Sequence, residues 1–481
     1  MILRLENMIF SSILFILFFL PAFILTYYLV PKKLKNIVIL VFSIVFYSWG
    51  APKFIFVILG TTFIDFHLVR WMSKTKGQLY RRLLLTLSVS INLGLLVYFK
   101  YSNFFIENVN AVLSLLGAHH IQWTKLVLPI GISFYTFETI TYVVDVYRKV
   151  HKPLDNFWSY QLYIIFFPKL IAGPIIRYHD LADQIEDRSK DETVDNILTG
   201  FYRFAIGVSK KVLIANQMGL YADSVFALSY ADLGTYTAWM GILAYTFQIY
   251  FDFSGYSDMA IGIAKMVGFR FPENFNNPYI SQNITEFWRR WHISLGAWMR
   301  NYLYIPLGGN RVATKSRLYF NLWFVFLASG LWHGASWSFI LWGAYHGIFL
   351  VLERSFLLKV YEKIGKFPSM LITFFIVVLG WVFFRIENIN DAFIFLKRLF
   401  VFEGNASNLI DSEFYFYLLL AIAFSFITYF KWGKKWQNAI YFEHYNNKKH
   451  ITVFIAVLIL LFFSISSITA FGFNPFIYFR F

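Results

Sequence analysis

The sequence of 481 residues contains no cysteine, and only 15% of its residues are charged. The absence of cysteine excludes a disulfide scaffold, a cysteine nucleophile and palmitoylation of this chain. Covalent chemistry would therefore have to use serine, threonine, tyrosine, histidine, lysine or carboxylate side chains. Soluble domains carry roughly 25% charged residues, so the shortage of charge predicts a chain that is surrounded mainly by lipid.

Long apolar runs occupy most of the sequence, since 58% of the residues are hydrophobic. A run of about 20 apolar residues crosses a hydrocarbon core of about 30 Å. The runs lie at 9–30, 37–49, 54–69, 83–99, 124–146, 158–176, 197–215, 236–265, 318–332, 335–352, 369–384, 414–430 and 451–471. We therefore predict an all-α, polytopic integral membrane protein with about 10–13 transmembrane or re-entrant helices. No basic n-region or small-residue cleavage site frames the first run, which favours a retained helix over a signal peptide.

The net charge of +16 would suggest nucleic acid as the partner of a soluble protein. In this chain the basic residues instead cluster in loops, which the positive-inside rule assigns to the cytoplasmic side. The clusters lie at 32–35, 70–82, 148–152, 431–435 and 448–449. This distribution predicts that both chain ends lie outside the cytoplasm, and that membrane lipid, not nucleic acid, surrounds the protein.

No internal repeat of fixed period and no low-complexity tract divides the chain, so we interpret residues 1–481 as a single domain. The longest soluble-looking stretch, Arg177–Asn196, is too short to fold alone. Every function must therefore be built from membrane helices and the loops between them.

Two carboxylates, Asp252 and Asp258, occur inside the otherwise apolar stretch Tyr245–Phe269. A charged side chain at the centre of a membrane helix costs about 3 kcal/mol, so it usually faces a cavity or a partner. One interpretation is a functional cavity lined by these carboxylates. The other is structural: an ion pair, or a helix that breaks at Asp252 while Asp258 caps the next helix. Both interpretations place the segment beside a polar interior.

The stretch Asn277–Arg311 carries one apolar stripe at intervals of 3, 4, 3 and 4 residues, the spacing of one face of a helix. The stripe consists of Trp288, Trp291, Leu295, Trp298 and Tyr302. His292 lies at its edge, in a half-packed position. Backbone breakers on both sides favour a re-entrant or interfacial element. A helix on the bilayer surface with snorkelling arginines explains the stripe equally well, but it explains His292 less well.

The stretch Phe320–Leu350 has His333 at its centre, flanked on each side by about ten uncharged, mostly apolar residues. An imidazole at membrane mid-depth needs a hydrogen-bond partner, and its ordinary pKa of about 6.5 suits proton transfer near neutral pH. His333 is therefore either a buried structural histidine or a catalytic base. Gly334 and Ala335 beside it should leave room for a ligand.

His346 lies thirteen residues after His333. On a straight helix that separation is about 20 Å and places the rings on different faces, so we interpret His346 as a packing residue. No pair of histidines shows metal-site spacing, such as His-x-x-x-His with a nearby carboxylate. We expect no bound metal or cofactor.

Five stretches together resemble the membrane-bound O-acyltransferase family, in its bacterial alginate and peptidoglycan O-acetylase branch. The stretches are Gln248–Gly262, Phe271–Phe275, Thr285–Leu295, Tyr302–Arg311 and Leu331–Trp337. The teichoic-acid D-alanyl transfer proteins are a more distant resemblance. The likeness covers nearly the whole chain and is strongest from 170 to 350.

This resemblance implies tilted helices around a central channel, with a catalytic core at about 120–385. It identifies His333 with the family's signature catalytic histidine and His292 with a second polar position of the site. Asp258 matches a family motif residue that would shape or polarise the site, and the tryptophans near the histidines suit the exclusion of water. We therefore expect the substrate channel to be lined by Asp258, Trp288, Trp291, Trp332 and Ser336.

The resemblance also implies a reaction. Cytoplasmic acetyl-CoA would donate an acetyl group, which crosses the bacterial inner membrane for O-acetylation of an extracytoplasmic polysaccharide. Because no esterase-like domain is present, a separate extracytoplasmic SGNH-type O-acetyltransferase would complete the delivery. In the aromatic tail at 474–481, Tyr478 could relay the acyl group as a phenyl ester. The alternative for this tail is an aromatic anchor at the membrane interface.

Other functions remain open from the sequence. A transporter or flippase for a lipid-linked sugar could use Asp252 and Asp258 as coupling sites, although no inverted repeat supports it. D-alanyl transfer to teichoic acid and a non-catalytic scaffold for polymer export are further alternatives.

Overall fold

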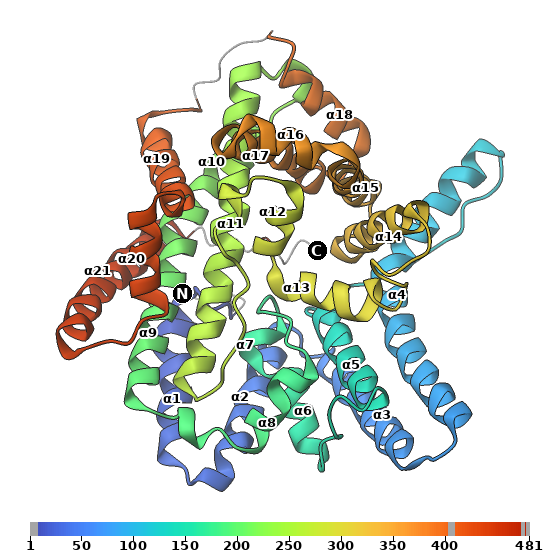
Figure 1. Cartoon of the computed structure of the whole chain (residues 1–481), viewed down its shortest axis with the longest axis vertical. Helices are drawn as coiled ribbons and strands as arrows, with labels where there is room; N and C mark the ends of the chain where they lie inside the picture. The colour runs from blue at the N-terminus through green and yellow to red at the C-terminus, as the bar shows by residue number, and fades with distance from the viewer. Residues whose placement is uncertain (1–7, 403–408, 473–476, 478–481) are drawn as a thin grey trace. The chain divides into compact units, whose positions relative to one another are not determined.

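The computed structural model describes residues 8–402, 409–472 and 477 (Figure 1). Its secondary structure consists of helices, and no strand occurs within these ranges. The all-α prediction is therefore confirmed. The chain forms two compact units, one of residues 1–197 with 263–271 and one of residues 198–262 with 272–481.

Within the described ranges, six helices are long and apolar enough to cross a membrane. The spans are Lys32–Gly50, Ile55–Lys74, Gln78–Leu115, Lys366–Arg385, Ser412–Tyr429 and Asn447–Ala470. They correspond to the helices α2 (Lys35–Gly50), α3 (Ile55–Lys74), α4 (Gln78–Leu115), α17 (Lys366–Arg385), α19 (Ser412–Phe426) and α21 (Asn447–Phe471), and the first and fifth spans include an adjoining 3-10 turn. These helices confirm a polytopic membrane protein. Most of the other apolar runs form shorter helices, interrupted by π turns or extended residues.

The first unit contains α2, α3 and α4 together with shorter helices. These are α1 (Leu20–Leu29), α5 (Ile132–Tyr147), α6 (Phe157–Ile165), α7 (Phe167–Leu170) and α8 (Tyr178–Glu186). The 38 residues of α4 span about 57 Å at 1.5 Å per residue, more than a hydrocarbon core requires. The interior of this unit contains a buried ion pair between Glu138 of α5 and Lys169 of α7.

The second unit contains α17, α19 and α21 and every candidate site residue within the described ranges. Most of α9 (Val194–Ser209) and α11 (Thr235–Met266) also belongs to it. Its remaining helices are α10 (Asn216–Phe226), α12 (Ile284–Arg290), α13 (Ile293–Trp298), α14 (Lys315–His333), α15 (Trp337–Leu352), α16 (Leu358–Ile364), α18 (Ile389–Arg398) and α20 (Lys431–Tyr441).

Helix α11 runs without interruption through Asp252 and Asp258 for 32 residues. Of the two structural alternatives for this stretch, the helix break at Asp252 is therefore wrong, and the ion pair is present. The reason is that the Asp252 carboxylate has a cationic partner, the ammonium group of Lys211 at 2.8 Å. With its charge compensated, Asp252 can stay inside a continuous helix.

The expected single helix with an aromatic stripe is interrupted. Helix α12 ends at Arg290, Trp291 is extended, and His292 adopts a left-handed conformation with φ 46° and ψ 55° before α13 begins. A further π-helical turn, Met299–Tyr304, follows α13. The prediction of one stripe from spacings of 3 and 4 residues assumed a single uniform helix. It therefore could not predict where the residues before and after His292 lie relative to each other.

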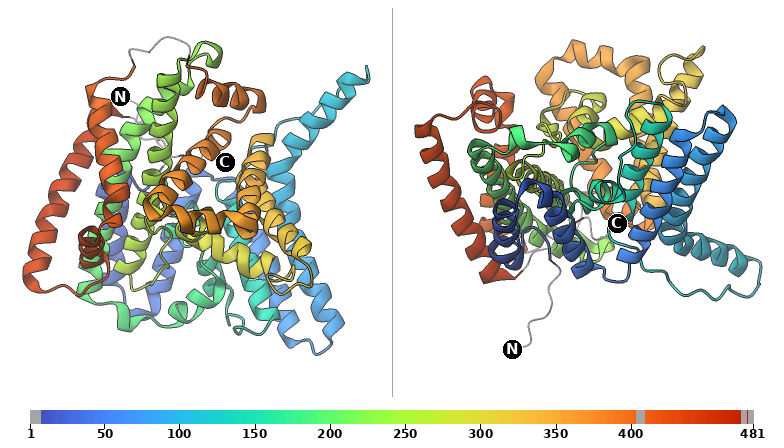
Figure 2. Two further views of the ribbon diagram at one scale, coloured as in Figure 1. Left: turned by 45° about the horizontal axis from the view of Figure 1, so that its top comes forward. Right: turned by 90° about the horizontal axis from the view of Figure 1, so that it is seen from below.

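The stretch around His333 is a helical hairpin. Helix α14 ends at His333, Gly334 is extended, and Ser336 caps the N-terminus of α15 by accepting a hydrogen bond from the backbone N–H of Phe339. The two helices lie side by side (Figure 2). Glycines allow this close approach, because a Cβ at Gly330 or Gly343 would collide with the backbone of the opposite helix.

Candidate functional site

His333 ends α14 and packs against three aromatic rings. Its side chain is only 4% exposed. Its ring centroid lies 4.8 Å from Trp332, 5.1 Å from Trp342 of α15 and 5.1 Å from Phe384 of α17. Three helices therefore hold the imidazole in an environment that favours the exclusion of water.

His292 is 1% exposed and lies at the left-handed junction between α12 and α13. Its Nδ1 is 3.1 Å from Oδ1 of Asn274. Its ring packs edge-on against Phe253 of α11 at 4.7 Å, and it lies 6.2 Å from the ring of Trp332. Because His333 also packs on Trp332, both histidines lie against the same indole.

The other aromatic residues extend this cluster. Trp288 contacts Trp342 at 5.4 Å, and Trp291 contacts Trp381 of α17 at 4.8 Å. The "aromatic enclosure" below means Trp288, Trp291, Trp332, Trp342, Trp381 and Phe384. Trp288, Trp291 and Trp332 were predicted from the sequence as channel residues, and the structure brings them together here.

The hairpin changes the interpretation of His346. The straight-helix separation from His333 does not apply, because the chain reverses between the two residues. His346 is fully buried and contacts Trp342 at 5.3 Å, so both histidines touch the same indole ring. Its ring also packs against Gly380 of α17, where a Cβ would lie 2.8 Å from Nε2. These contacts agree with a packing role.

The expected room for a ligand at Gly334 is not present. The ring of Phe339 fills the position that a Cβ on Gly334 would occupy. The sequence could not reveal this, because Phe339 reaches Gly334 only through the turn of the hairpin. Ser336, predicted in the channel, serves as the N-cap of α15.

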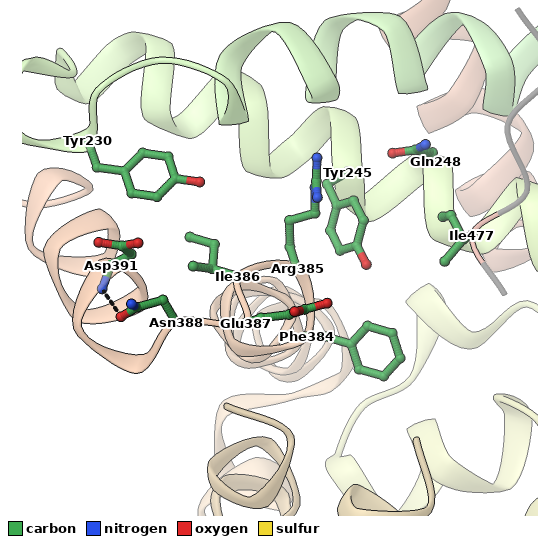
Figure 3. A pocket seen from close by; sticks show the side chains of 10 residues that line it. All are labelled: Tyr230, Tyr245, Gln248, Phe384, Arg385, Ile386, Glu387, Asn388, Asp391 and Ile477. Carbon is green, nitrogen blue, oxygen red and sulfur yellow. Dashed lines mark hydrogen bonds between the residues drawn. The ribbon is translucent and has the colours of Figure 1, made fainter. Parts of the chain in front are cut away.

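Open space lies instead beyond Phe384, in a cavity of about 300 Å³ (Figure 3). Tyr230 and Asp391 lie at one end of the view, and Gln248 and Ile477 lie at the other. The lining consists of Tyr230, Tyr245, Gln248, Phe384, Arg385, Ile386, Glu387, Asn388, Asp391 and Ile477. Because Phe384 both lines the cavity and contacts His333, its ring is the shared wall between them.

Asp258 lies in a buried ion-pair cluster. Its carboxylate accepts hydrogen bonds from Arg203 at 2.7 Å and from Lys210 at 2.6 Å, and Arg203 also binds Glu273 at 3.0 Å. The ring of Tyr441 from α20 lies 4.3 Å from the Arg203 guanidinium. The structural interpretation of Asp258 as an ion-pair residue matches these contacts.

Asp252 is linked to the end of the chain. Besides its pairing with Lys211, its Oδ2 accepts a hydrogen bond from the backbone N–H of Ile477 at 2.9 Å. Tyr478, the predicted relay residue, lies outside the described residues. Nowhere in the described ranges do three or more histidine or acidic side chains form a group that could hold a metal ion.

Sequence reasoning missed Asn274, Trp342, Trp381 and Phe384. Asn274 lies in one of the five stretches that carry the family resemblance, so that likeness could have singled it out. Trp342, Trp381 and Phe384 lie in uniformly apolar helices. Only the packing of α15 and α17 shows that Trp342 and Phe384 contact His333 and that Trp381 packs against both of these residues.

Comparisons with known proteins place these features in context. Residues 5–384 match the model of MBOAT, the membrane-bound O-acyltransferase family. The chain is 46% identical over 400 residues to the probable alginate O-acetylase AlgI of Azotobacter vinelandii, covering 82% of this chain and 78% of that protein. It is 38% identical over 436 residues to the peptidoglycan O-acetyltransferase of Helicobacter pylori, covering 84% and 82%. It is 31% identical over 282 residues to the teichoic acid D-alanyltransferase of Bacillus subtilis, covering 54% and 69%.

Proposed function

The chain belongs to the membrane-bound O-acyltransferase family, and we propose that this multi-pass acyltransferase moves an acetyl group from cytoplasmic acetyl-CoA across the bacterial inner membrane. The final product is an O-acetylated extracytoplasmic polysaccharide. The relatives named for alginate and peptidoglycan acetylation support this product class. The observation that carries the proposal is the placement of His333 inside the aromatic enclosure, one ring away from a polar cavity.

In this mechanism His333 is the general base. An acceptor hydroxyl gives its proton to the imidazole while its oxygen forms a bond to the thioester carbonyl carbon. The carbon–sulfur bond then breaks, and the proton passes from the imidazolium to the departing CoA thiolate. Atoms and charges therefore balance, and the histidine returns to its neutral form.

Indole N–H groups are suitable donors for the developing oxyanion. The Nε1 atoms of Trp288 and Trp342 are buried and have no hydrogen-bond partner among the residues described. A buried donor without a partner is costly, and an oxyanion would satisfy it. The enclosure would also keep water from hydrolysing the thioester.

The donor is proposed to approach from the cytoplasm, where basic loops attract the phosphates of CoA. The acceptor comes from the other side, and Tyr478 serves as the first acceptor. Ile477, the residue before it, lines the same cavity as Phe384, which supports this role for Tyr478. An SGNH-type transferase partner then passes the acetyl group to the polysaccharide.

The relay can be tested by mass spectrometry of the intact protein. After incubation with acetyl-CoA, an acetyl adduct should be found on Tyr478 and should disappear in Tyr478→Phe, which lacks only the hydroxyl group. Undiminished polymer acetylation in cells carrying Tyr478→Phe would reject the relay.

D-alanyl transfer is the second candidate, because the Bacillus subtilis relative carries that name. Purified protein offered labelled acetyl-CoA or labelled D-alanyl donor separates the two. Label from acetyl-CoA alone supports acetylation, and label from the D-alanyl donor alone supports the alternative.

A further inference from the structure

The side chain of Asn274 lies beside His292, forms several hydrogen bonds and is only 1% exposed. Its Oδ1 is 3.1 Å from Nδ1 of His292, 3.2 Å from the backbone N of Ser294 and 2.9 Å from Oγ of Ser294. Its Nδ2 donates to Oγ of Ser257 on α11 at 3.0 Å. One amide therefore ties the His292 junction to α11.

These contacts fix the orientation of the amide. A backbone N–H can only donate, so the Asn274 atom that faces the backbone N of Ser294 must be the carbonyl oxygen. The same oxygen faces Nδ1 of His292, and an oxygen of this kind can only accept. Nδ1 of His292 must therefore carry the hydrogen.

A neutral imidazole has one protonated and one basic nitrogen. With the hydrogen on Nδ1, the lone pair of His292 is on Nε2. That atom is buried, and no hydrogen-bond partner for it occurs in the described part of the chain. The ring lies against Trp332, the indole that also contacts His333.

Asn274 also holds the unusual backbone of His292. A left-handed conformation is costly for a residue with a Cβ and persists only when its surroundings impose it. The backbone carbonyl of Asn274 accepts from the N–H of Ile293 at 2.9 Å, and its side chain holds Ser294. Both residues that follow His292 are thus bound to the same asparagine.

We propose that Asn274 is a positioning residue for acyl transfer, which holds His292 in the Nδ1–H tautomer and so makes Nε2 a hydrogen-bond acceptor inside the site. This inference rests on the proposed function for its effect on catalysis. It also excludes one role of His292, the stabilisation of the oxyanion. A neutral ring of this tautomer cannot donate from Nε2 to an oxyanion, so His292 accepts a hydrogen bond from the CoA thiol that forms when the carbon–sulfur bond breaks. Oxyanion stabilisation then falls to the indole N–H groups.

The tautomer can be measured without substrate by nitrogen NMR of protein labelled with ¹⁵N-histidine. The signals of His292 are identified by their loss in His292→Gln. We expect protonated Nδ1 and unprotonated Nε2 in the wild-type protein and in Asn274→Asp, whose carboxylate can accept the same hydrogen bonds. In Asn274→Ala the hydrogen should redistribute between the two nitrogens.

Transfer from labelled acetyl-CoA gives the second readout. The rate should fall at least about tenfold in Asn274→Ala, because a ring in the wrong tautomer presents the wrong nitrogen. Asn274→Asp should recover most of it. The matched control is Asn276→Ala, the same change at an exposed position two residues away, which should keep the wild-type rate.

A wild-type His292 protonated at Nε2 would overturn the proposal, and so would an Asn274→Ala variant with unchanged tautomer and rate. Failure of the wild-type protein to use acetyl-CoA would count against the proposed function instead. The NMR measurement distinguishes these two failures, because the tautomer of His292 is measured without an acetyl donor or an acetyl acceptor.

Discussion

At the scale of single residues, the position of His333 depends on how its neighbour Gly334 is packed. The Phe339 ring occupies the space where any side chain at position 334 would begin. Phe339 also contacts Phe384 at 5.1 Å, and Phe384 contacts His333 at the same distance. A side chain at position 334 should therefore displace Phe339 and, through it, Phe384, as well as distort the turn.

Gly334→Ala should lower the rate of acetyl transfer by about 10- to 100-fold, because small misplacements of catalytic groups have effects of this size. The double variant Gly334→Ala with Phe339→Leu removes the collision and should recover part of the rate. An undiminished rate in Gly334→Ala would show that the site tolerates the displaced ring.

Asp258 offers a test between its two interpretations. Its carboxylate compensates the buried cations Arg203 and Lys210. Asp258→Asn should therefore destabilise the folded protein by about 3–5 kcal/mol, seen as a lower midpoint of thermal unfolding in detergent. The same change at exposed Asp155 is the control and should leave the midpoint unchanged. Lost transfer at unchanged stability would instead support a channel role.

His333 could be singled out from the sequence because a polar side chain in a long apolar run is conspicuous. Trp381 and Phe384 could not, because one aromatic residue in an apolar helix resembles any other. Their role arises from which face of α17 meets α15, and such long-range packing leaves no local pattern.

At the scale of elements, two local breaks create the site. The left-handed turn at His292 separates α12 from α13, and the turn at Gly334 separates α14 from α15. The sequence predicted aromatic helices at both places but not the breaks within them. A left-handed histidine has no sequence signal of its own, because its cost is offset by hydrogen bonds that Asn274, eighteen residues away, accepts from residues 292–294.

The orientation of α12 depends on Glu353, which follows α15 and is 1% exposed. Its carboxylate accepts hydrogen bonds from the backbone N–H of Ile284, the backbone N–H of Thr285 at 2.9 Å and the Thr285 hydroxyl at 2.6 Å. These donors lie at the N-terminus of α12, where a negative charge is favourable. Glu353 thus ties α12 to the hairpin.

Glu353→Ala should leave these buried donors unsatisfied and lower the free energy of unfolding by about 1–3 kcal/mol. Thermal unfolding in detergent measures the loss, and protease digestion should begin near residues 277–290. The control is Glu362→Ala on the exposed part of α16. Equal stability of the two variants would show that Glu353 does not hold α12.

At the scale of the whole molecule, composition and apolar runs were sufficient to predict an all-α, polytopic membrane protein. The number of crossings was harder to predict, because several runs of sufficient length contain breaks that hydrophobicity does not record. The side of the membrane on which each connecting segment lies is still a prediction from charge, in which the C-terminus is extracytoplasmic and the basic segment 431–435, at the start of α20, is cytoplasmic.

The absence of cysteine makes this topology directly testable, because each introduced cysteine is unique. In intact cells, a membrane-impermeant thiol reagent should label Phe481→Cys but label Lys434→Cys only after permeabilisation. The unmodified protein is the control and should not be labelled. The reverse pattern would invert the topology and place the proposed acceptor tail in the cytoplasm.

The most direct measurement of the central claim is acetyl transfer by purified protein in lipid vesicles supplied with labelled acetyl-CoA. His333→Gln should reduce the rate by about 10²- to 10⁴-fold, the usual contribution of a general base, while its unfolding midpoint stays near that of the wild type. His346→Gln changes a second buried histidine that contacts the same Trp342 ring, and it should keep most of the rate. Transfer that survives His333→Gln, or that falls equally in both variants, would contradict a catalytic base at position 333.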